Sequence, residues 1–295
     1  AIDSVRAQTR ADWQLVVVDN GNSDAIASIV DRYRDDPRIV LLRQDNKGYC
    51  GGVAAATAAA TGEFISVFDS DDLLEPSFVE RVADVVDSVP GVAAIGCDAE
   101  LFYDPEHLRP PEDYFRSIGR KSLPSPNHSA GVMELMDEGV PGYTGAVRRD
   151  VWELLDGYSP AETGVEPDVV LWLRMAARGL DIRILADKLV RFRQRPHSES
   201  RDPGKIRDFE HRLQKSFIAG GLESGLTHQQ IADTGMLRRL RYQQALRCAR
   251  EAFLTGQPEL SRRCARMAFD QRHTLRATLV LAGLQLSPTL LAAVR

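Results

Sequence analysis

The chain has 295 residues, of which 43% are hydrophobic and 27% are charged. This composition is typical of a globular protein with a sizeable core, and it excludes the disordered, collagen-like and disulfide-scaffold classes. Its 37 Lys and Arg residues face 42 Asp and Glu residues, and the resulting net charge of -5 disfavours nucleic acid as a partner. The longest apolar runs are well short of the ~20 residues that cross a bilayer, so we expect no membrane-spanning helix.

The cysteines and the first residues bear on the compartment. No CxxC motif or paired spacing joins the four cysteines, which are Cys50, Cys97, Cys248 and Cys264. That pattern predicts reduced thiols in a cytoplasmic protein rather than a disulfide framework or a zinc site. The residues after Ala1 do not form an export signal. Ile2, Val5 and Arg6 resemble the end of an amphipathic helix, and we expect a further strand to precede it.

Short apolar runs alternate with helix-length segments from residue 13 onward. The predicted strands cover residues 13–18, 39–42, 64–68, 92–95, 144–147, 182–185 and 189–193. The predicted helices cover residues 24–34, 52–60, 132–136, 150–155 and 167–178, with another that opens near Pro76. This order predicts an α/β fold with a mostly parallel sheet flanked by helices. The apolar composition of residues 64–68 predicts a strand that is buried on both faces.

Two regions depart from this alternation. Residues 104–128 contain five prolines among polar side chains, which predicts a long surface loop that closes over a bound ligand. Beyond residue 202 only helical patterns appear, at residues 206–218, 237–253 and 259–269 and in an apolar end. We therefore predict one domain over residues 1–200 and a helical C-terminal region over residues 201–295.

Carboxylates follow two of the predicted strands. Asp69, Asp71 and Asp72 come directly after one strand, and Asp19 ends an earlier one. Because open α/β sheets bind ligands at the carboxyl ends of their strands, we expect these acids to face one crevice. Carboxylates in that position suit Mg²⁺ or Mn²⁺ that also holds phosphate oxygens. The alternative is a turn of solvated acids without a ligand, since short acidic strings are common.

An ordered set of motifs resembles one enzyme family. The set consists of VVVDNGNSD, then DNKG before an alanine-rich helix, then GEFISVFDSDD and EPDVVLWLR. It resembles the family 2 glycosyltransferases with the GT-A fold, over roughly residues 13–200. The resemblance implies an inverting, metal-dependent transfer of a sugar from a UDP-, GDP- or dTDP-sugar to an acceptor hydroxyl. The implied acceptor is a glycan, a lipid-linked molecule or a small molecule.

The resemblance also implies which residues hold the donor and the metal. Contacts with the donor or its nucleotide are implied for Asp19, Asn46, Lys47, Asp69 and Arg195. Metal ligands are implied at Asp69 and Asp71, with His197 at the end of the last strand as a further candidate. The alternative for His197 and the arginines before it is a solvated edge strand with a surface histidine.

The candidate general base lies in EPDVVLWLR. A transfer to a hydroxyl needs a base that takes its proton. The resemblance implies Asp168, with Glu166 as the second candidate because Pro167 separates two acids that the family carries side by side. Pro167 favours a helix start, so Asp168 is expected in the first turn. The alternative is an acid that merely stabilises the start of the helix.

Other functions and contacts stay open from the residues alone. One alternative is a non-catalytic module that binds a sugar-nucleotide or a carbohydrate. A haloacid-dehalogenase-type phosphohydrolase is another, although its motif carries Thr or Val where Leu73 stands. Tyr143 and Trp172 are candidates to line an acceptor pocket, although core packing is more typical of such residues. Ten arginines over residues 238–276 indicate a solvated helix face, or contact with another copy or with the inner face of a membrane.

Overall fold

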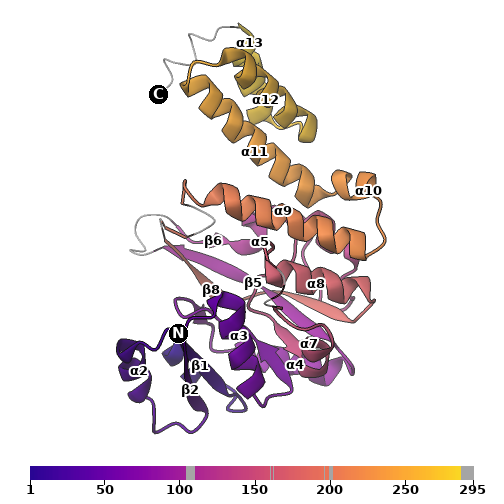
Figure 1. Ribbon diagram of the computed structural model, residues 1–295. Coiled ribbons are helices and arrows are strands. Elements are labelled where there is room, and N and C mark those ends of the chain that lie inside the picture. Colours follow the sequence, from indigo (N-terminus) through magenta and orange to yellow (C-terminus); the bar gives the residue numbers. More distant parts are fainter. Residues whose placement is uncertain (104–109, 160, 162, 196, 199–201, 287–295) are drawn as a thin grey trace. The chain divides into compact units, whose positions relative to one another are not determined.

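The chain forms two compact units in the computed structural model (Figure 1), which describes residues 1–103, 110–159, 161, 163–195, 197–198 and 202–286. The first unit covers Ala1–Leu226 and the second Thr227–Arg295. Helix α9, Ile206–Glu223, belongs to the first unit, although the composition change near residue 200 groups it with the C-terminal region. It lies there because its residue Gly220 packs against Leu173 of the preceding helix.

The strands follow the predicted apolar runs. They are β1 (Leu15–Asn20), β2 (Ile39–Gln44), β3 (Phe64–Ser66), β4 (Leu73–Leu74), β5 (Ala94–Tyr103), β6 (Glu112–Asp113), β7 (Ala146–Arg148) and β8 (Ile182–Gln194). The two runs predicted at residues 182–185 and 189–193 join into the single strand β8. Its pairing with β5 shifts register on both sides of Asp98. Strands β4 and β6 are too short for a periodic pattern to reveal them.

The prediction of a mostly parallel sheet is wrong, because the larger sheet is mixed. Its strand order is β3-β7-β5-β8-β4, with β6 also paired to β5. Strands β5 and β8 run parallel, whereas β7 is antiparallel to both β3 and β5, and β4 is antiparallel to β8. Strands β1 and β2 form a separate parallel pair. Apolar runs identify strands but not their direction, which the course of the intervening chain decides.

Strand β3 also differs from its prediction. It lies at the edge of the mixed sheet, and its residue Ser66 is exposed. The expectation of a strand buried on both faces is therefore wrong. The central strands are instead β5 and β8, whose side chains Ile95, Leu101, Leu185 and Val190 form the core with α4.

Helices surround the sheets of the first unit (Figure 1). They are α1 (Ile2–Arg6), α2 (Asp24–Asp31), α3 (Gly48–Ala59), α4 (Phe78–Ser88), α5 (Tyr114–Ser117), α6 (Val132–Glu138), α7 (Arg149–Leu154), α8 (Pro167–Ala177) and α9. Local sequence explains several starts. Ser23 accepts a hydrogen bond from the N–H of Ile26 and so caps α2, and Pro167 occupies the first turn of α8.

The proline-rich region is only partly a loop. Residues 104–109, where part of the expected lid lies, are outside the described residues. Residues 110–128 contain β6 and α5, which the proline count concealed. Phe115 of α5 is buried, and its N–H donates a 2.8 Å hydrogen bond to Oδ1 of Asp98 in β5. This segment is therefore attached to the sheet.

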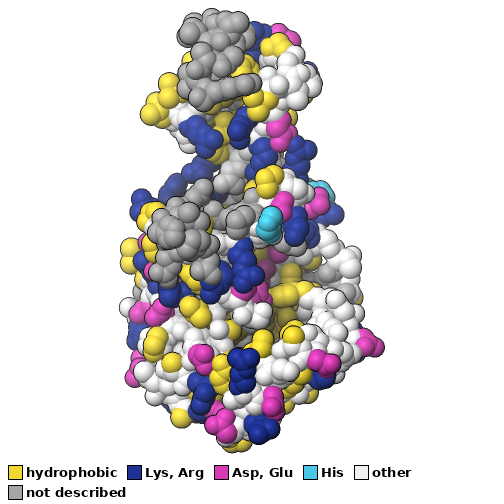
Figure 2. All heavy atoms as spheres, turned by 90° about the vertical axis from the view of Figure 1, so that its left-hand side faces the viewer, with side chains coloured by type: hydrophobic (Ala, Val, Ile, Leu, Met, Phe, Trp, Pro, Cys, Tyr) yellow, Lys and Arg dark blue, Asp and Glu magenta, His cyan; other side chains and the backbone are white. Residues whose placement is uncertain are grey.

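The second unit is helical, as predicted. Its helices are α10 (His228–Asp233), α11 (Gly235–Leu254), α12 (Pro258–Gln271) and α13 (Leu275–Leu286). Thr227 and Gln230 form a capping box that starts α10, a signal that the periodicity analysis missed. Figure 2 shows Lys and Arg side chains, in dark blue, on the visible face of this unit at the top of the view. Within the described part of the chain, none of the helices is both long and apolar enough to span a membrane.

Candidate active site

Three carboxylates meet in the turn between β3 and β4. Oxygen atoms of Asp69, Asp71 and Asp72 lie within 4.8 Å of one another. Burial, followed by the charge of Asp71, raises the pKa of Asp69. Oxygen ligands gathered in this way suit a hard divalent cation such as Mg²⁺ or Mn²⁺, which would relieve the repulsion between them. The donor set therefore fits the predicted metal.

Asp72 joins this turn to the central strand β8. Its carboxylate accepts hydrogen bonds from the hydroxyl of Tyr143 and, at 2.8 Å, from the N–H of Arg193. It is 2% exposed, and burial raises its pKa to about 6. Because Asp72 is held by these two partners, it fixes the turn, and the partly buried Asp69 and Asp71 are left nearer to solvent.

The basic cluster at the end of β8 reaches the same turn. Nη2 of Arg195 lies 3.6 Å from Oδ2 of Asp71, and Nε of Arg193 donates a 2.9 Å hydrogen bond to the backbone oxygen of Asp71. The structure thus brings the predicted donor residue Arg195 to the acidic turn. The side chain of His197 is 89% exposed, and its Nδ1 lies 3.5 Å from Oδ2 of Asp202. Its role as a metal ligand stays a prediction.

Asp168 lies in the first turn of α8, as expected, and shares an environment with Asp69. Burial and then the charge of Glu166 raise the pKa of Asp168 to about 7, with a smaller contribution from Asp69. Tyr49 at the start of α3 lies near Asp69 and Asp168, and burial and the charges of these two carboxylates raise its pKa. Its ring stacks on that of Tyr158 with 6.3 Å between centroids. Sequence analysis missed Tyr49, although it directly follows the DNKG turn.

Glu166 has a different setting from Asp168. Nε of Arg212 in α9 donates a 2.7 Å hydrogen bond to its carboxylate, and its backbone N–H donates one of the same length to Oγ of Ser216. The carboxylate of Glu166 is therefore paired with a guanidinium, in the contact between α8 and α9. Sequence analysis missed Arg212 because α9 lies beyond the predicted domain boundary.

Asp19 is buried at the end of β1. Its side chain is fully buried. Oδ1 accepts a 2.9 Å hydrogen bond from the N–H of Ser23, and Oδ2 accepts one of 3.1 Å from Nε of Arg43. These contacts fix the turn that leads into α2. A direct donor contact by Asp19 stays a prediction.

The DNKG turn is tied to β1 through Asn20. The side-chain oxygen of Asn20 accepts a 3.1 Å hydrogen bond from the N–H of Lys47, and its amide donates one of 2.9 Å to the backbone oxygen of Gly48. Asn46 in turn accepts a 2.9 Å hydrogen bond from the N–H of Gly48. The predicted donor residues Asn46 and Lys47 therefore lie beside the end of β1.

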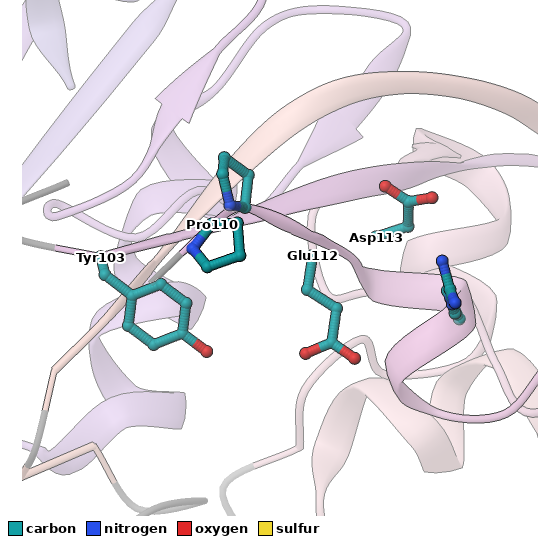
Figure 3. A pocket seen from close by; sticks show the side chains of 6 residues that line it. Tyr103, Pro110, Glu112 and Asp113 are labelled. Carbon is teal, nitrogen blue, oxygen red and sulfur yellow. The ribbon is translucent and has the colours of Figure 1, made fainter. Parts of the chain in front are cut away.

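A pocket of 370 Å³ opens beside the end of β5 (Figure 3). It is lined by Tyr103, Pro110, Pro111, Glu112, Asp113 and Arg116. In Figure 3 the hydroxyl of Tyr103 and the carboxylate of Glu112 point toward the same open space. Tyr103 pairs in register with Gln194, the residue before Arg195, so the pocket adjoins the strand end that reaches Asp71. Trp172 does not line it, because that side chain is 3% exposed in the core.

Comparison with known families identifies the first part of this architecture. The family described as Glycosyl transferase family 2 matches residues 1–138, which include β1–β3 and the acidic turn. The match places residues 1–138 in glycosyltransferase family 2. The resemblance inferred from the motifs is thereby confirmed.

Curated proteins that are similar to the chain include several named as glycosyltransferases. It is 25% identical over 224 residues to the putative glycosyltransferase EpsE of Bacillus subtilis, and the match covers 74% of each chain. It is 36% identical over 87 residues to the uncharacterized glycosyltransferase alr2836 of Nostoc, a match that covers 29% of this chain. That match spans 27% of the Nostoc protein, and other matches span 24% and 11% of their relatives.

Solved structures confirm the fold over nearly the whole chain. The structure of S. aureus TarS 1-349 in complex with UDP-GlcNAc matches with a TM-score of 0.59 and 15% identity, covering 96% of this chain and 82% of TarS 1-349. The mannosyltransferase PcManGT of Pyrobaculum calidifontis, in complex with GDP-Man and Mn²⁺, matches with a TM-score of 0.57 and 20% identity. That match covers 95% of this chain and 73% of PcManGT. The chain therefore has an α/β fold like that of GT-A transferases, followed by helices.

Proposed function

We propose that the protein is a metal-dependent, inverting glycosyltransferase that moves a sugar from a nucleotide-sugar to an acceptor hydroxyl. The observation that carries this proposal is the neighbourhood of the acidic turn after β3 and Asp168 of α8. The turn supplies cation ligands, and Asp168 supplies a carboxylate with a pKa of about 7. A pKa near the working pH favours a general base.

Asp168 acts on the acceptor in this mechanism. Its carboxylate takes the proton of the acceptor hydroxyl while the hydroxyl oxygen forms a bond to the anomeric carbon. The bond from that carbon to the diphosphate breaks on the opposite face, so the configuration inverts. Glu166 does not compete for the proton, because Arg212 holds its carboxylate.

Asp69, Asp71 and Arg195 act on the donor. The two aspartates would hold a Mg²⁺ or Mn²⁺ ion, which neutralises charge that develops on the departing diphosphate. Arg195 lies 3.6 Å from Asp71 and supplies a further positive charge for the phosphates. Asn46 and Lys47, which lie beside the end of β1, contact the nucleotide in this mechanism. The donors bound by TarS and PcManGT make UDP-GlcNAc and GDP-mannose the first candidates.

The pocket at Tyr103 is the proposed acceptor site. It combines an aromatic ring, the carboxylates of Glu112 and Asp113, and the guanidinium of Arg116. Sugar hydroxyls bind well to such groups, since charged side chains make the stronger hydrogen bonds. The acceptor class, whether glycan, lipid-linked molecule or small molecule, stays open between these alternatives.

The test is donor binding by calorimetry, with UDP-GlcNAc and GDP-mannose, each with and without Mn²⁺. We expect one donor to bind more tightly with Mn²⁺, and Asp71→Asn to remove that gain. Asp84→Asn is the matched control, because Asp84 lies on the surface of α4. Equal Mn²⁺-dependent binding in wild type and Asp71→Asn would exclude the metal site.

A non-catalytic binding module is the remaining alternative. It would bind the donor but would not release free sugar and nucleotide. Slow, Mn²⁺-dependent hydrolysis of the donor, lost in Asp168→Asn, excludes this alternative. The phosphohydrolase alternative is set aside by the family 2 match.

A further inference from the structure

Two cysteines of the second unit face each other across neighbouring helices. Sγ of Cys248 in α11 lies 2.7 Å from Sγ of Cys264 in α12, and both residues are free thiols. Bonded sulfurs lie about 2 Å apart, so only small side-chain movements separate this pair from a covalent link. Both are reduced, in line with the prediction, but the spacing of the cysteines in the sequence did not indicate that these two lie close together.

The two helices form an antiparallel hairpin. A three-residue connection, 255–257, joins α11 to α12. Nε of Arg238 near the start of α11 donates a 3.0 Å hydrogen bond to the backbone oxygen of Gln271 at the end of α12. Closer to the connection, Oγ of Ser261 donates one of 2.7 Å to the backbone oxygen of Ala249. These contacts fix the register of the hairpin around the two thiols.

A short internal repeat places a cysteine at the same position in both helices. The sequence Arg-Cys-Ala-Arg occurs at residues 247–250 and again at residues 263–266, and Ala-Phe follows two residues later in both. Two antiparallel helices with the same sequence present the same face to each other. Accordingly Ala249 and Ala265, next to the cysteines, are 2% and 0% exposed. Small side chains at these positions allow the helices to approach closely.

We propose that Cys248 and Cys264 are a modification site at which a reversible disulfide forms in the folded protein. The oxidant is a low-molecular-weight disulfide such as oxidised glutathione. Cys264 is 6% exposed, and burial raises its pKa to about 11, so the more exposed Cys248 reacts first.

The disulfide forms by two successive thiol–disulfide exchange reactions. The thiolate of Cys248 attacks one sulfur of oxidised glutathione, and one glutathione thiolate leaves. Cys264 then gives up its proton and attacks Sγ of Cys248, and the second glutathione leaves. The two cysteines lose two electrons in total, and one glutathione disulfide becomes two glutathione thiols.

Peptide mapping of the full chain tests this proposal. The folded protein is incubated with oxidised glutathione or with a reducing agent, and then cleaved after glutamate without reduction. Glu251 and Glu259 lie between the cysteines, so cleavage separates them unless a disulfide joins the peptides. We expect the joined peptides, lighter by two hydrogens, only after oxidation, and far less of them when the chain is unfolded in denaturant during oxidation.

Single variants provide the matched controls. Cys248→Ser and Cys264→Ser should each abolish the joined peptides, whereas Cys50→Ser, in the first unit, should keep them. The proposal is wrong if wild type carries glutathione on Cys248 without joining, or if both thiols remain unmodified. Equal amounts of joined peptides from folded and unfolded protein would also overturn the proposal, because the disulfide would then form without the hairpin.

Discussion

At the scale of single residues, the site gives two acids of one segment different partners. Arg212 pairs with Glu166, whereas Asp168 is buried near the negative charges of Glu166 and Asp69. We expect Asp168→Asn to lower kcat by about 100- to 10,000-fold, the usual effect of removing a general base. Donor affinity should be nearly unchanged. Steady-state kinetics and calorimetry with the same donor measure both quantities.

The kcat of Asp168→Asn is compared with that of Glu166→Gln. Glu166→Gln removes a carboxylate of similar size two residues away, and its loss of rate should be much smaller. If Glu166→Gln is the slower enzyme, Glu166 is the base. If both variants turn over at the normal rate, the base lies outside this segment.

The pKa of Asp168 also predicts how the rate depends on pH. A general base must be deprotonated, so kcat/KM should fall about tenfold for each pH unit below about 7 and level off above it. The charge of Glu166 helps to raise this pKa, so Glu166→Gln should move the inflection to lower pH. A profile of kcat/KM from pH 5 to 9 measures both effects. A flat profile across pH 7 would show that another group takes the proton.

At the scale of elements, the contact between α8 and α9 depends on a glycine. A Cβ atom on Gly220 of α9 would lie 2.5 Å from Cδ1 and 2.6 Å from Cβ of Leu173, which is fully buried. Alanine favours a helix by about 1 kcal/mol over glycine. The overlap outweighs this gain, because inserting a methyl group into a packed core costs about 1–3 kcal/mol.

We therefore expect Gly220→Ala to lower the free energy of unfolding by up to about 2 kcal/mol. Because α9 also carries Arg212, the variant should weaken the ion pair between Arg212 and Glu166 as well. Chemical denaturation compares it with Gly21→Ala, whose added Cβ meets nothing within 4 Å. A stabilised Gly220→Ala protein would mean that the two helices can separate without loss.

At the scale of the whole molecule, the two units differ in charge and size. Residues 227–295 carry eleven arginines and four acidic residues, a net charge of +7, in a chain whose total is -5. This unit is also much the smaller of the two, and smaller units bury a lower fraction of their surface. Like charges repel within it as well. It should therefore unfold first.

Two spectroscopic probes can separate the units. All three tryptophans, Trp13, Trp152 and Trp172, lie in the first unit, whereas the second contributes helix to the far-ultraviolet signal. In a urea titration we expect the circular dichroism to begin changing before the tryptophan fluorescence. Coincident transitions would show that the units unfold as one.

Much of the candidate site could be predicted because its signals are local. Asp69 and Asp71 directly follow a strand, and Asp168 directly follows a proline that starts a helix, so a few neighbouring residues suffice to place each of them. The same holds for most strands and helices, whose periodicity is a property of consecutive residues. The family resemblance also rested on short consecutive motifs, and the family match confirmed it.

Patterns of consecutive residues were enough to predict most of the strands and helices, the acidic turn and the resemblance to glycosyltransferase family 2. The folded chain was needed to reveal the directions of the strands, the pairing of Glu166 with Arg212, and the approach of Cys248 to Cys264. Each of these depends on residues that are distant along the chain, and a local pattern does not encode which distant segment packs against it. Strand direction and side-chain partners are set when the core packs. The burial of many side chains together then favours one arrangement of the strands and helices over the others.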